Sequence, residues 1–357
     1  MFECVNQTAQ SAREQAQRIA FGPSAFQAAR VLRDSGILER VEKSGATGLA
    51  LAEIGAVPSL PAYAVRVLVD AALGLDLLTL ADGRYRTTKT AWFLLYDAMT
   101  RVNMDFSHAV NYLGMHALDR ALQEGKPAGL ATFGDWPTIY QALAHLPAEA
   151  RRTWLAFDHY YSDLAFAPAL ALLASRQHRR IMDIGGNTGR FAAACIAQDP
   201  AVQVTIVDLP GQIGLSKAQF GGTARIDRIA WHAVDLLDPA ATLPKDHDAI
   251  WMSQFLDCFA ETEIIAILQL CAAALANSGR IYILEPFWDQ QKQTTAAFCL
   301  QQTSLYFAAM ANGNSRMYTS DVMTDMVRRA GLELLEIVRC VGIVHSLMIC
   351  RPIQSPP

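Results

Sequence analysis

The 357-residue sequence contains no block of basic residues and no long uninterrupted apolar run. Thirty lysines and arginines against 34 acidic residues leave a formal net charge of -4, which disfavours nucleic acid as the main partner. No apolar run reaches the ~18 residues that a membrane span needs. The first residues lack the basic start and apolar core of a signal peptide. We therefore expect a cytoplasmic protein whose partners are neither nucleic acid nor a membrane.

Cysteine is also sparse. The seven cysteines are odd in number, and none has the Cys-x-x-Cys spacing of a metal site. This pattern predicts reduced thiols in a reducing compartment and no metal centre. The chain is instead rich in hydrophobic residues, 52% against 18% charged, which suits large buried cores or a large subunit interface.

A glycine-rich turn between two apolar strands is the most informative feature that is present. The first strand leads into Asp183-x-Gly185-Gly186-x-x-Gly189, and the second ends on Asp208. Glycines let the backbone approach a ligand closely, and the helix that follows offers free N–H groups. A carboxylate at the end of the second strand suits a ribose diol.

The acid before these glycines distinguishes between nucleotide cofactors. A dinucleotide fingerprint is built to take a pyrophosphate, which the Asp183 carboxylate would repel. The same carboxylate would attract the ammonium and sulfonium groups of S-adenosylmethionine. The pattern therefore predicts an S-adenosylmethionine site.

We expect three parts in the chain, beginning with residues 1–100. Apolar spacing predicts a helix from Ala16 that stops near Gly36, followed by a helix-turn-helix and a hairpin turning at Asp82-Gly83. This is a winged-helix-like pattern. Because its second helix offers only Arg66 as a positive charge, we interpret the domain as a dimerisation or packing element.

Residues 101–178 form a predicted helical connector that is rich in aromatic residues. The run from Trp154 to Asp163 contains Phe157, His159 and Tyr160. Such a run suits one wall of an aromatic substrate pocket. It equally suits an interdomain helix with a buried aromatic face.

Residues 179–357 alternate apolar strands with helices. This order predicts an α/β fold with a mostly parallel, doubly wound, Rossmann-like sheet and an antiparallel edge. Ligands of such sheets bind at the carboxyl ends of the strands. That edge should collect the polar positions Asp183, Asp208, Asp235, Ser253 to Asp257, and Glu285.

Together these motifs resemble the two-domain small-molecule O-methyltransferases, which include plant caffeic-acid-type enzymes and bacterial enzymes of secondary metabolism. The resemblance also uses Val207-Asp208-Leu209-Pro210, Asp235-Leu236 and Leu284-Glu285-Pro286, and it covers nearly the whole chain. It implies a class I methyltransferase domain and a homodimer formed through the N-terminal domain. The cofactor-binding residues that it implies are Asp183, Gly185, Gly186, Gly189, Asp208, Leu209, Asp235, Leu236 and Ser253.

The chain departs from this family at four positions. Asn187 stands where the loop usually has a third glycine, and Ser253 where plant members often have lysine. Asp257 occupies the place of the family's catalytic histidine, and Met317 that of a second orienting glutamate. Glu285 matches the first orienting glutamate.

Aspartate is an unusual base, so its role stays open. Asp257, Glu285 and His159 are the catalytic candidates. An exposed aspartate near pKa ~3.9 is a poor base for a phenol of pKa ~10, but burial or a neighbouring carboxylate such as Glu285 would raise it. Asp257 then acts as base, orients His159, or holds a hydroxyl while a ring carbon is methylated. The last alternative is an inert Asp257.

The predicted acceptor is an aromatic or phenolic small molecule, either free or bound to a carrier protein. Its binding residues are expected to be Phe157, Tyr160, Phe255, Trp288, Gln302, Tyr306 and Met310. We expect O-methylation or C-methylation of the phenol ring. The alternatives are a family relative that hydroxylates or decarboxylates such a molecule, and a ligand-sensing transcriptional regulator.

Overall fold

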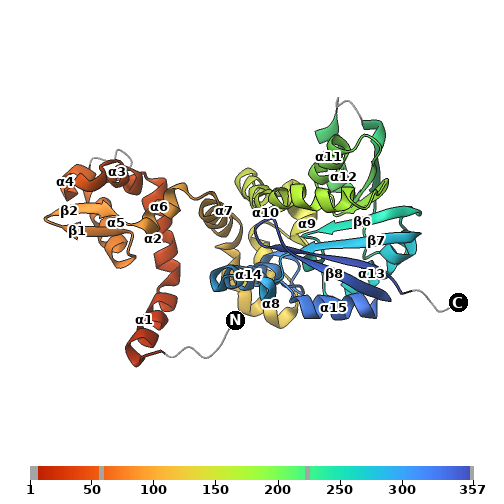
Figure 1. Ribbon diagram of the computed structural model, residues 1–357. Coiled ribbons are helices and arrows are strands. Elements are labelled where there is room, and N and C mark those ends of the chain that lie inside the picture. Colours follow the sequence, from red (N-terminus) through yellow and green to blue (C-terminus); the bar gives the residue numbers. More distant parts are fainter. Residues whose placement is uncertain (1–6, 56–59, 222–225, 354–357) are drawn as a thin grey trace. The chain divides into compact units, whose positions relative to one another are not determined.

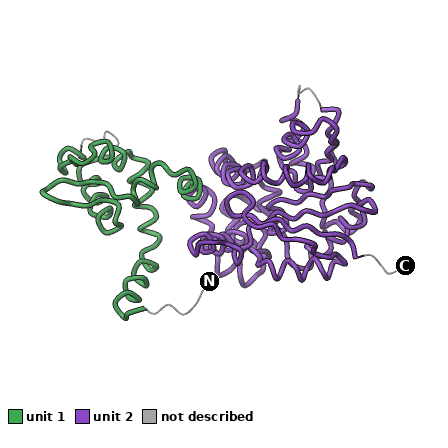
Figure 2. Tube along the Cα trace, viewed as in Figure 1, with its two compact units in different colours: residues 1–105 green, residues 106–357 purple. Residues whose placement is uncertain are grey.

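The computed structural model describes residues 7–55, 60–221 and 226–353. The chain divides into two compact units, residues 1–105 and 106–357 (Figure 2). Among the described residues, no helix has both the length and the apolar character that crossing a membrane requires. Because the second unit begins at residue 106, the helical segment that precedes the sheet belongs to the same unit as the sheet.

The first unit is mainly helical. Its elements are α1 (Ala9–Ala20), α2 (Gly22–Asp34), α3 (Ile37–Lys43), α4 (Leu51–Ile54), α5 (Ala62–Gly74), β1 (Leu78–Ala81), β2 (Arg84–Thr87) and α6 (Lys89–Tyr96), and α7 (Ala98–Phe106) begins in it. The single helix expected from Ala16 is wrong, because the chain breaks at Phe21 and Pro23 starts the next helix. The stop at Gly36 is confirmed by its left-handed φ of 80°.

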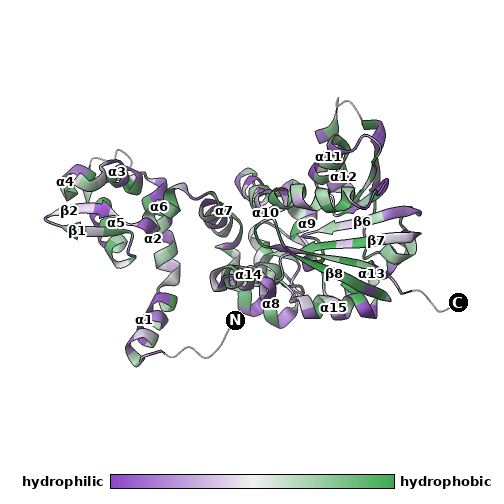
Figure 3. Ribbon diagram, in the orientation of Figure 1, coloured by the Kyte–Doolittle hydropathy of each residue, from purple (hydrophilic) through white to green (hydrophobic). Residues whose placement is uncertain are grey.

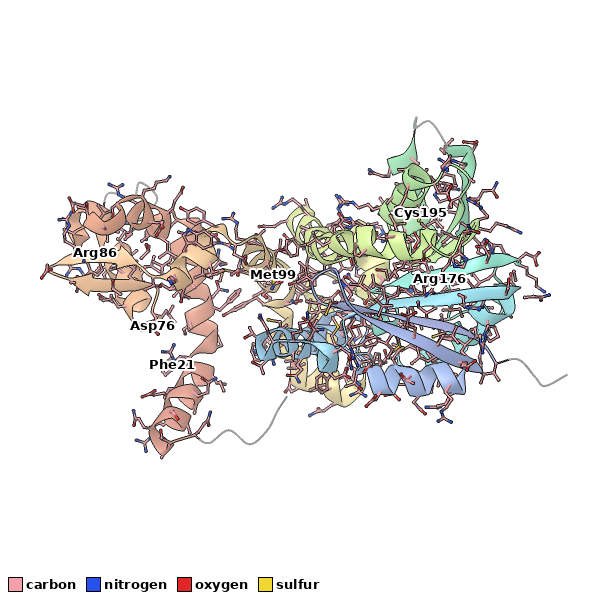
Figure 4. All side chains as sticks on the ribbon, viewed as in Figure 1. Phe21, Asp76, Arg86, Met99, Arg176 and Cys195 are labelled. Atoms are coloured by element: carbon pink, nitrogen blue, oxygen red, sulfur yellow. The ribbon has the colours of Figure 1, made fainter. Side chains whose placement is uncertain are left out.

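The predicted hairpin is confirmed. Leu78 pairs with Thr87 and Ala81 with Arg84 in an antiparallel register. Asp82 and Gly83 both have positive φ, 53° and 71°, as a two-residue turn between right-twisted strands requires. Arg86, labelled in Figure 4, donates from this hairpin to the Ala46 carbonyl at 2.7 Å, so its guanidinium is used within the unit.

The second unit is built on a seven-stranded sheet with the order β5-β4-β3-β6-β7-β9-β8 (Figure 1). All neighbouring strands are parallel except at β9, which is antiparallel to both β7 and β8, so the predicted antiparallel edge is confirmed. The strands are β3 (Arg180–Ile184), β4 (Gln203–Asp208), β5 (Ile229–Ala233), β6 (His247–Ser253), β7 (Leu275–Glu285), β8 (Leu332–Val341) and β9 (His345–Pro352).

Helices cover both faces of this sheet, so its strands are hydrophobic on both sides (Figure 3). Ile250 and Met252 point to the face packed by α13 (Glu261–Ala274) and α15 (Ser320–Arg329). Ala249 and Trp251 point to the face packed by α10 (Ala148–Ala174), α11 (Arg190–Gln198) and α12 (Pro210–Phe220). Because successive side chains of a strand point to opposite faces, each face of the sheet has its own hydrophobic core.

A third core lies outside the sheet, between the helical segment and the region after β7. It joins α8 (Leu118–Glu124), α9 (Ile139–Ala142) and α10 to α14 (Thr294–Tyr306) and the π-helical turn Phe307–Ala311. Gly114 and Gly129 allow two backbones to meet the turn that carries Met310. A Cβ atom added at Gly129 would lie 2.8 Å from the Ala309 carbonyl oxygen and would overlap the Gly114 backbone.

This packing predicts that Gly129→Ala destabilises the protein. The obstructing atoms belong to backbone, which cannot move aside cheaply, so we expect a loss of about 1–3 kcal/mol in the free energy of unfolding. Gly214→Ala in α12 is the matched control, because a Cβ atom there meets nothing within 4 Å. Urea unfolding of both variants measures the difference, and equal stabilities would contradict the close packing.

Candidate functional site

The carboxyl ends of the parallel strands bring the predicted polar residues to one edge of the sheet. Asp183 is next to last in β3, Asp208 ends β4 and Glu285 ends β7. Ser253 ends β6, and Asp235 follows β5. Because β3 lies between β4 and β6, the chain changes direction across the sheet there, and that position is where such folds bind ligands.

Glycine is required in the loop after β3 because other groups approach it closely. Gly185 has a φ of 70°, and a Cβ atom there would overlap the Phe255 ring. A Cβ atom at Gly186 would lie 2.8 Å from Asp183 Oδ2. Gly189 caps α11 with a φ of 82°. The loop therefore touches both the β3 acid and the segment after β6.

Asp208 holds the shape of this loop. Its carboxylate accepts hydrogen bonds from the backbone N–H of Asn187 at 2.8 Å and of Leu209 at 2.7 Å. Burial raises the pKa of Asp208 to about 6, and these two bonds oppose the rise. Each oxygen still has a lone pair for a further donor. Beyond β5, Asp235 is exposed and Leu236 is half-buried.

Asp183 is a buried acid with spare hydrogen-bonding capacity. It is 3% exposed, and its Oδ2 has no hydrogen-bond donor among the described residues. Burial, and then the Asp208 charge, raise the pKa of Asp183 to about 8. Thr188 Oγ1 and Ser253 Oγ are likewise buried and without described partners. A cationic, polar ligand such as S-adenosylmethionine fits this set of groups.

A second pair of acids lies at the ends of β6 and β7. Asp257 is 5% and Glu285 2% exposed, and both line one narrow cavity with Met317. Glu285 Oε1 accepts from the backbone N–H groups of Phe255 at 3.0 Å and Leu256 at 2.8 Å, which fixes the segment that carries Asp257.

The electrostatics of this pair favour shared protonation. Burial raises the pKa of Asp257 to about 7; a hydrogen bond from the Cys258 thiol at 3.4 Å opposes the rise, and the Asp158 charge adds to it. Burial, and then the Asp257 charge, raise the pKa of Glu285 well above its usual range. Burial and the mutual repulsion of two carboxylates therefore both favour a protonated form of the pair.

Four of the predicted acceptor residues meet in the third core. Phe157, Trp288, Tyr306 and Met310 lie in one cluster that also contains Cys258. Trp154 Nε1 donates to the Tyr306 hydroxyl at 2.7 Å. The Phe157 and Tyr306 rings both contact Phe106, with centroid distances of 4.0 and 5.1 Å.

The other three predicted acceptor residues lie elsewhere. Phe255 sits beside the glycine loop and makes an edge contact with Phe259. The Tyr160 ring meets Tyr161, and Gln302 is exposed. Met310, although in the cluster, is fully buried against Gly114, which is the environment of a core residue.

His159 does not join the acid pair through any described hydrogen bond. Its Nδ1 lies 3.6 Å from Asp158 Oδ2, and burial lowers its pKa. Asp158 is instead the residue of α10 that reaches the site, where it accepts from Asn187 and Gln254. The helical periodicity of the sequence could have indicated Asp158, because it follows Trp154 by four positions and therefore lies on the same face of the helix.

Gln254 and His345 were also missed from the sequence. Gln254 has a left-handed φ of 49°, and its amide oxygen lies 2.6 Å from Nε2 of the buried His345. His345 is the first residue of β9, the antiparallel strand, and therefore comes to the same edge as the other strands' carboxyl ends. Nothing local in the sequence marks such a contact between residues 91 positions apart.

Comparison with known proteins agrees with this geometry. The profile of the O-methyltransferase domain matches residues 115–333, and that of a Dimerisation2-like domain matches residues 13–85. The chain is 27% identical over 277 residues to a 3-hydroxy-5-methyl-1-naphthoate 3-O-methyltransferase of Streptomyces sahachiroi, covering 76% of each protein. It is 24% identical over 317 residues to an L-tyrosine C(3)-methyltransferase of Streptomyces lavendulae, covering 88% of this chain and 85% of the relative.

A solved structure shares the fold. The S-adenosylmethionine-dependent methyltransferase SibL superposes with a TM-score of 0.69 over 94% of this chain and 98% of its own, at 22% sequence identity. The class I methyltransferase fold with an N-terminal helical dimerisation-type domain, expected from the sequence, is confirmed.

The buried Asp183 carboxyl near the end of β3 predicts that the stability of the protein depends on pH. In Asp183 the folded pKa of about 8 lies above the unfolded one, so the free energy of unfolding decreases as pH rises from about 4 towards 8. Asp183→Asn removes this penalty, and we expect it to stabilise the ligand-free protein by roughly 2–4 kcal/mol at pH 8 and much less at pH 5. Urea unfolding at both pH values measures it.

The exposed acid Asp227 supplies the control for this test, as Asp227→Asn. That variant should match the wild type at both pH values. A stability difference for Asp183→Asn that does not change with pH would show that the Asp183 carboxyl is not the group responsible.

Proposed function

The chain belongs to the O-methyltransferase family of S-adenosylmethionine-dependent enzymes, and we propose that it methylates a hydroxylated aromatic small molecule at a site built around Asp257. The contact between Gly185 and Phe255 carries this proposal. It brings the cofactor loop against the segment that holds Asp257, and Cys258 of that segment lies in the aromatic cluster. The cofactor loop, the segment with Asp257 and the aromatic cluster therefore follow one another without a gap.

The residues that would hold the cofactor follow from their donors and charges. Asp183 and the loop from Gly185 to Gly189 suit its methionine part, Asp208 and Leu209 its ribose, and Asp235, Leu236 and Ser253 the remainder. Bound there, the cofactor supplies a methyl group that its sulfonium already activates. The protein's own contribution is to orient the acceptor and to move its proton.

Asp257 is the residue that we propose for proton transfer. A carboxylate of pKa about 7 is half ionised at neutral pH and can accept the proton of a phenol hydroxyl. Glu285 anchors the Asp257 segment by accepting hydrogen bonds from two backbone N–H groups, and burial keeps the Asp257 pKa high. His159, which has no described bond to this pair, is the weaker candidate.

Two chemical outcomes are compatible with this role. In O-methylation Asp257 takes the hydroxyl proton and the oxygen is methylated. In C-methylation Asp257 holds the hydroxyl while an adjacent ring carbon is methylated, and the ring proton then leaves to a carboxylate. The names of the two relatives include one reaction of each kind. Both are tested with acceptors offered free and attached to a carrier protein.

Asp257→Asn is the first test. The amide keeps the side-chain size but cannot take a proton, so we expect kcat to fall by about 10²–10⁴-fold with little change in cofactor affinity. The wild-type rate should rise with pH through about 7, because the ionised form of Asp257 is the active one, and the variant should lose this rise. Initial rates with methyl-labelled cofactor and a panel of phenols measure both quantities.

Glu261→Gln is the matched control, since Glu261 lies four residues after Asp257, is partly exposed and pairs with Arg316 at 3.1 Å. It should retain the wild-type rate and pH profile. Mass spectrometry with fragmentation then locates the label on oxygen or on a ring carbon. A product that gains oxygen instead of a methyl group, or unchanged transfer in Asp257→Asn, would overturn the proposed role.

We also propose that the protein is a homodimer formed through its first unit. The Dimerisation2-like profile covers residues 13–85. In this unit α1 contains no buried residue, and Phe21, labelled in Figure 4, is 65% exposed. On α6, Trp92, Phe93 and Tyr96 are each about half exposed. A monomer rarely leaves so many large apolar side chains in water.

A dimer formed through this surface predicts that introducing charged residues there lowers the molecular mass of the protein in solution. Replacing Trp92 and Phe93 together by aspartate should convert the dimer to monomer, because burying two carboxylates opposes association. Light scattering coupled to size-exclusion chromatography measures the mass. Leu122→Asp in the second unit, where Leu122 is 61% exposed, is the control and should leave the dimer intact. A monomeric wild type would contradict the proposal.

A further inference from the structure

Five polar side chains form one continuous chain of hydrogen bonds across the carboxyl edge of the sheet. His345 Nε2 lies 2.6 Å from Gln254 Oε1, and Gln254 Nε2 donates to Asp158 Oδ1 at 3.3 Å. Asn187 Nδ2 donates to Asp158 Oδ2 at 3.2 Å, and Gln212 Nε2 donates to Asn187 Oδ1 at 3.1 Å. Asp158 is the central member and accepts from both sides.

The two residues that Asp158 binds have unusual backbones. Asn187 and Gln254 both have a φ of 49°, in the left-handed region that residues other than glycine seldom adopt. Such conformations persist where the surroundings over-determine them. One lies in the cofactor loop, and the other lies three residues before Asp257. Asp158 therefore braces the two segments that must meet for methyl transfer.

We propose that Asp158 is a positioning residue that holds the cofactor loop through the Asn187 side chain and ties it to the Asp257 segment through Gln254. The inference rests on the proposed function, because it assigns the loop to the cofactor. In the family pattern the position of Asn187 is usually glycine, which has no side-chain amide that could donate to Asp158. The tie is therefore a feature of this chain's own loop.

An ionised Asp158 suits this task, because both oxygens of a carboxylate are acceptors, whereas protonation turns one of them into a hydroxyl that donates. The groups that act on it are Asp163 and His159 on its own helix and Arg190 from α11. Asp257 after β6 and Tyr306 of α14 also interact with it electrostatically. Burial is the largest influence and raises the pKa of Asp158 to about 6, so we expect the tie to weaken as the pH falls from 8 through about 6 and the carboxylate is protonated.

The test is calorimetric binding of S-adenosylmethionine to the full chain. We expect Asp158→Ala and Asn187→Gly each to weaken binding about 10- to 100-fold, as loss of a charged hydrogen bond implies. Since both remove the same tie, the double variant should be no weaker than the worse single variant. Asp163→Asn is the matched control on the same helix, where Asp163 pairs with Arg190, and it should bind within about twofold of wild type.

A pH series separates positioning from loss of packing. Asp158→Asn keeps the shape of the side chain but not its charge, so the ratio of its dissociation constant to that of wild type should be large at pH 8. The ratio should approach one at pH 5, where wild-type Asp158 is itself protonated. Thermal unfolding verifies that each variant is folded. A merely structural residue would not give this pH dependence.

Three results would overturn the inference. They are wild-type affinity in folded Asp158→Ala and Asp158→Asn, losses that multiply in the double variant, and a dissociation-constant ratio that stays constant with pH. Failure of the wild type to bind S-adenosylmethionine is a different result, because it removes the proposed function together with this inference.

Discussion

The burial of acids at one edge of the sheet is the constraint on which the site depends. Asp183, Asp257 and Glu285 are each at most 5% exposed. Ionising such a group away from water is costly unless hydrogen bonds or an opposite charge compensate. Glu285 Oε1 accepts from two backbone N–H groups, but Asp183 Oδ2 and Glu285 Oε2 have no donor among the described residues. This imbalance leaves the edge with unused capacity for a hydrogen-bond donor or a positive charge.

The sheet tolerates this imbalance because its two faces are fully packed. Alternate residues of β6 enter different cores, so the backbone of the strand is fixed up to the point where the polar segment begins. The ends of these strands are therefore fixed in position, and the glycine loop that follows β3 contacts Phe255 after β6. Stability from the cores thus supports a group of acids that on its own is destabilising.

The sequence was most informative where a local pattern has one physical meaning. A glycine at positive φ before a helix, as Gly189 is, and Asp82-Gly83 between two strand-like runs both specify backbone geometry directly. Alternation of apolar strands and helices likewise predicted the parallel sheet and the edge along which Asp208 and Glu285 both lie. The prediction of a single helix from Ala16 was wrong because it followed the apolar periodicity and did not take account of Pro23, which starts a new helix.

The sequence by itself determined the fold and the class of cofactor, because these rest on the order and spacing of local motifs, and the resemblance of those motifs to a known family indicated the family. Only the tertiary structure decided which hydrogen bonds these acids accept and how far burial raises the pKa of each. In the folded chain Asp158, and not His159, binds Asn187 and Gln254, and His345 of the antiparallel strand lies 2.6 Å from Gln254. The reason is that hydrogen bonds and burial act through space, so residues far apart in sequence set one another's charge.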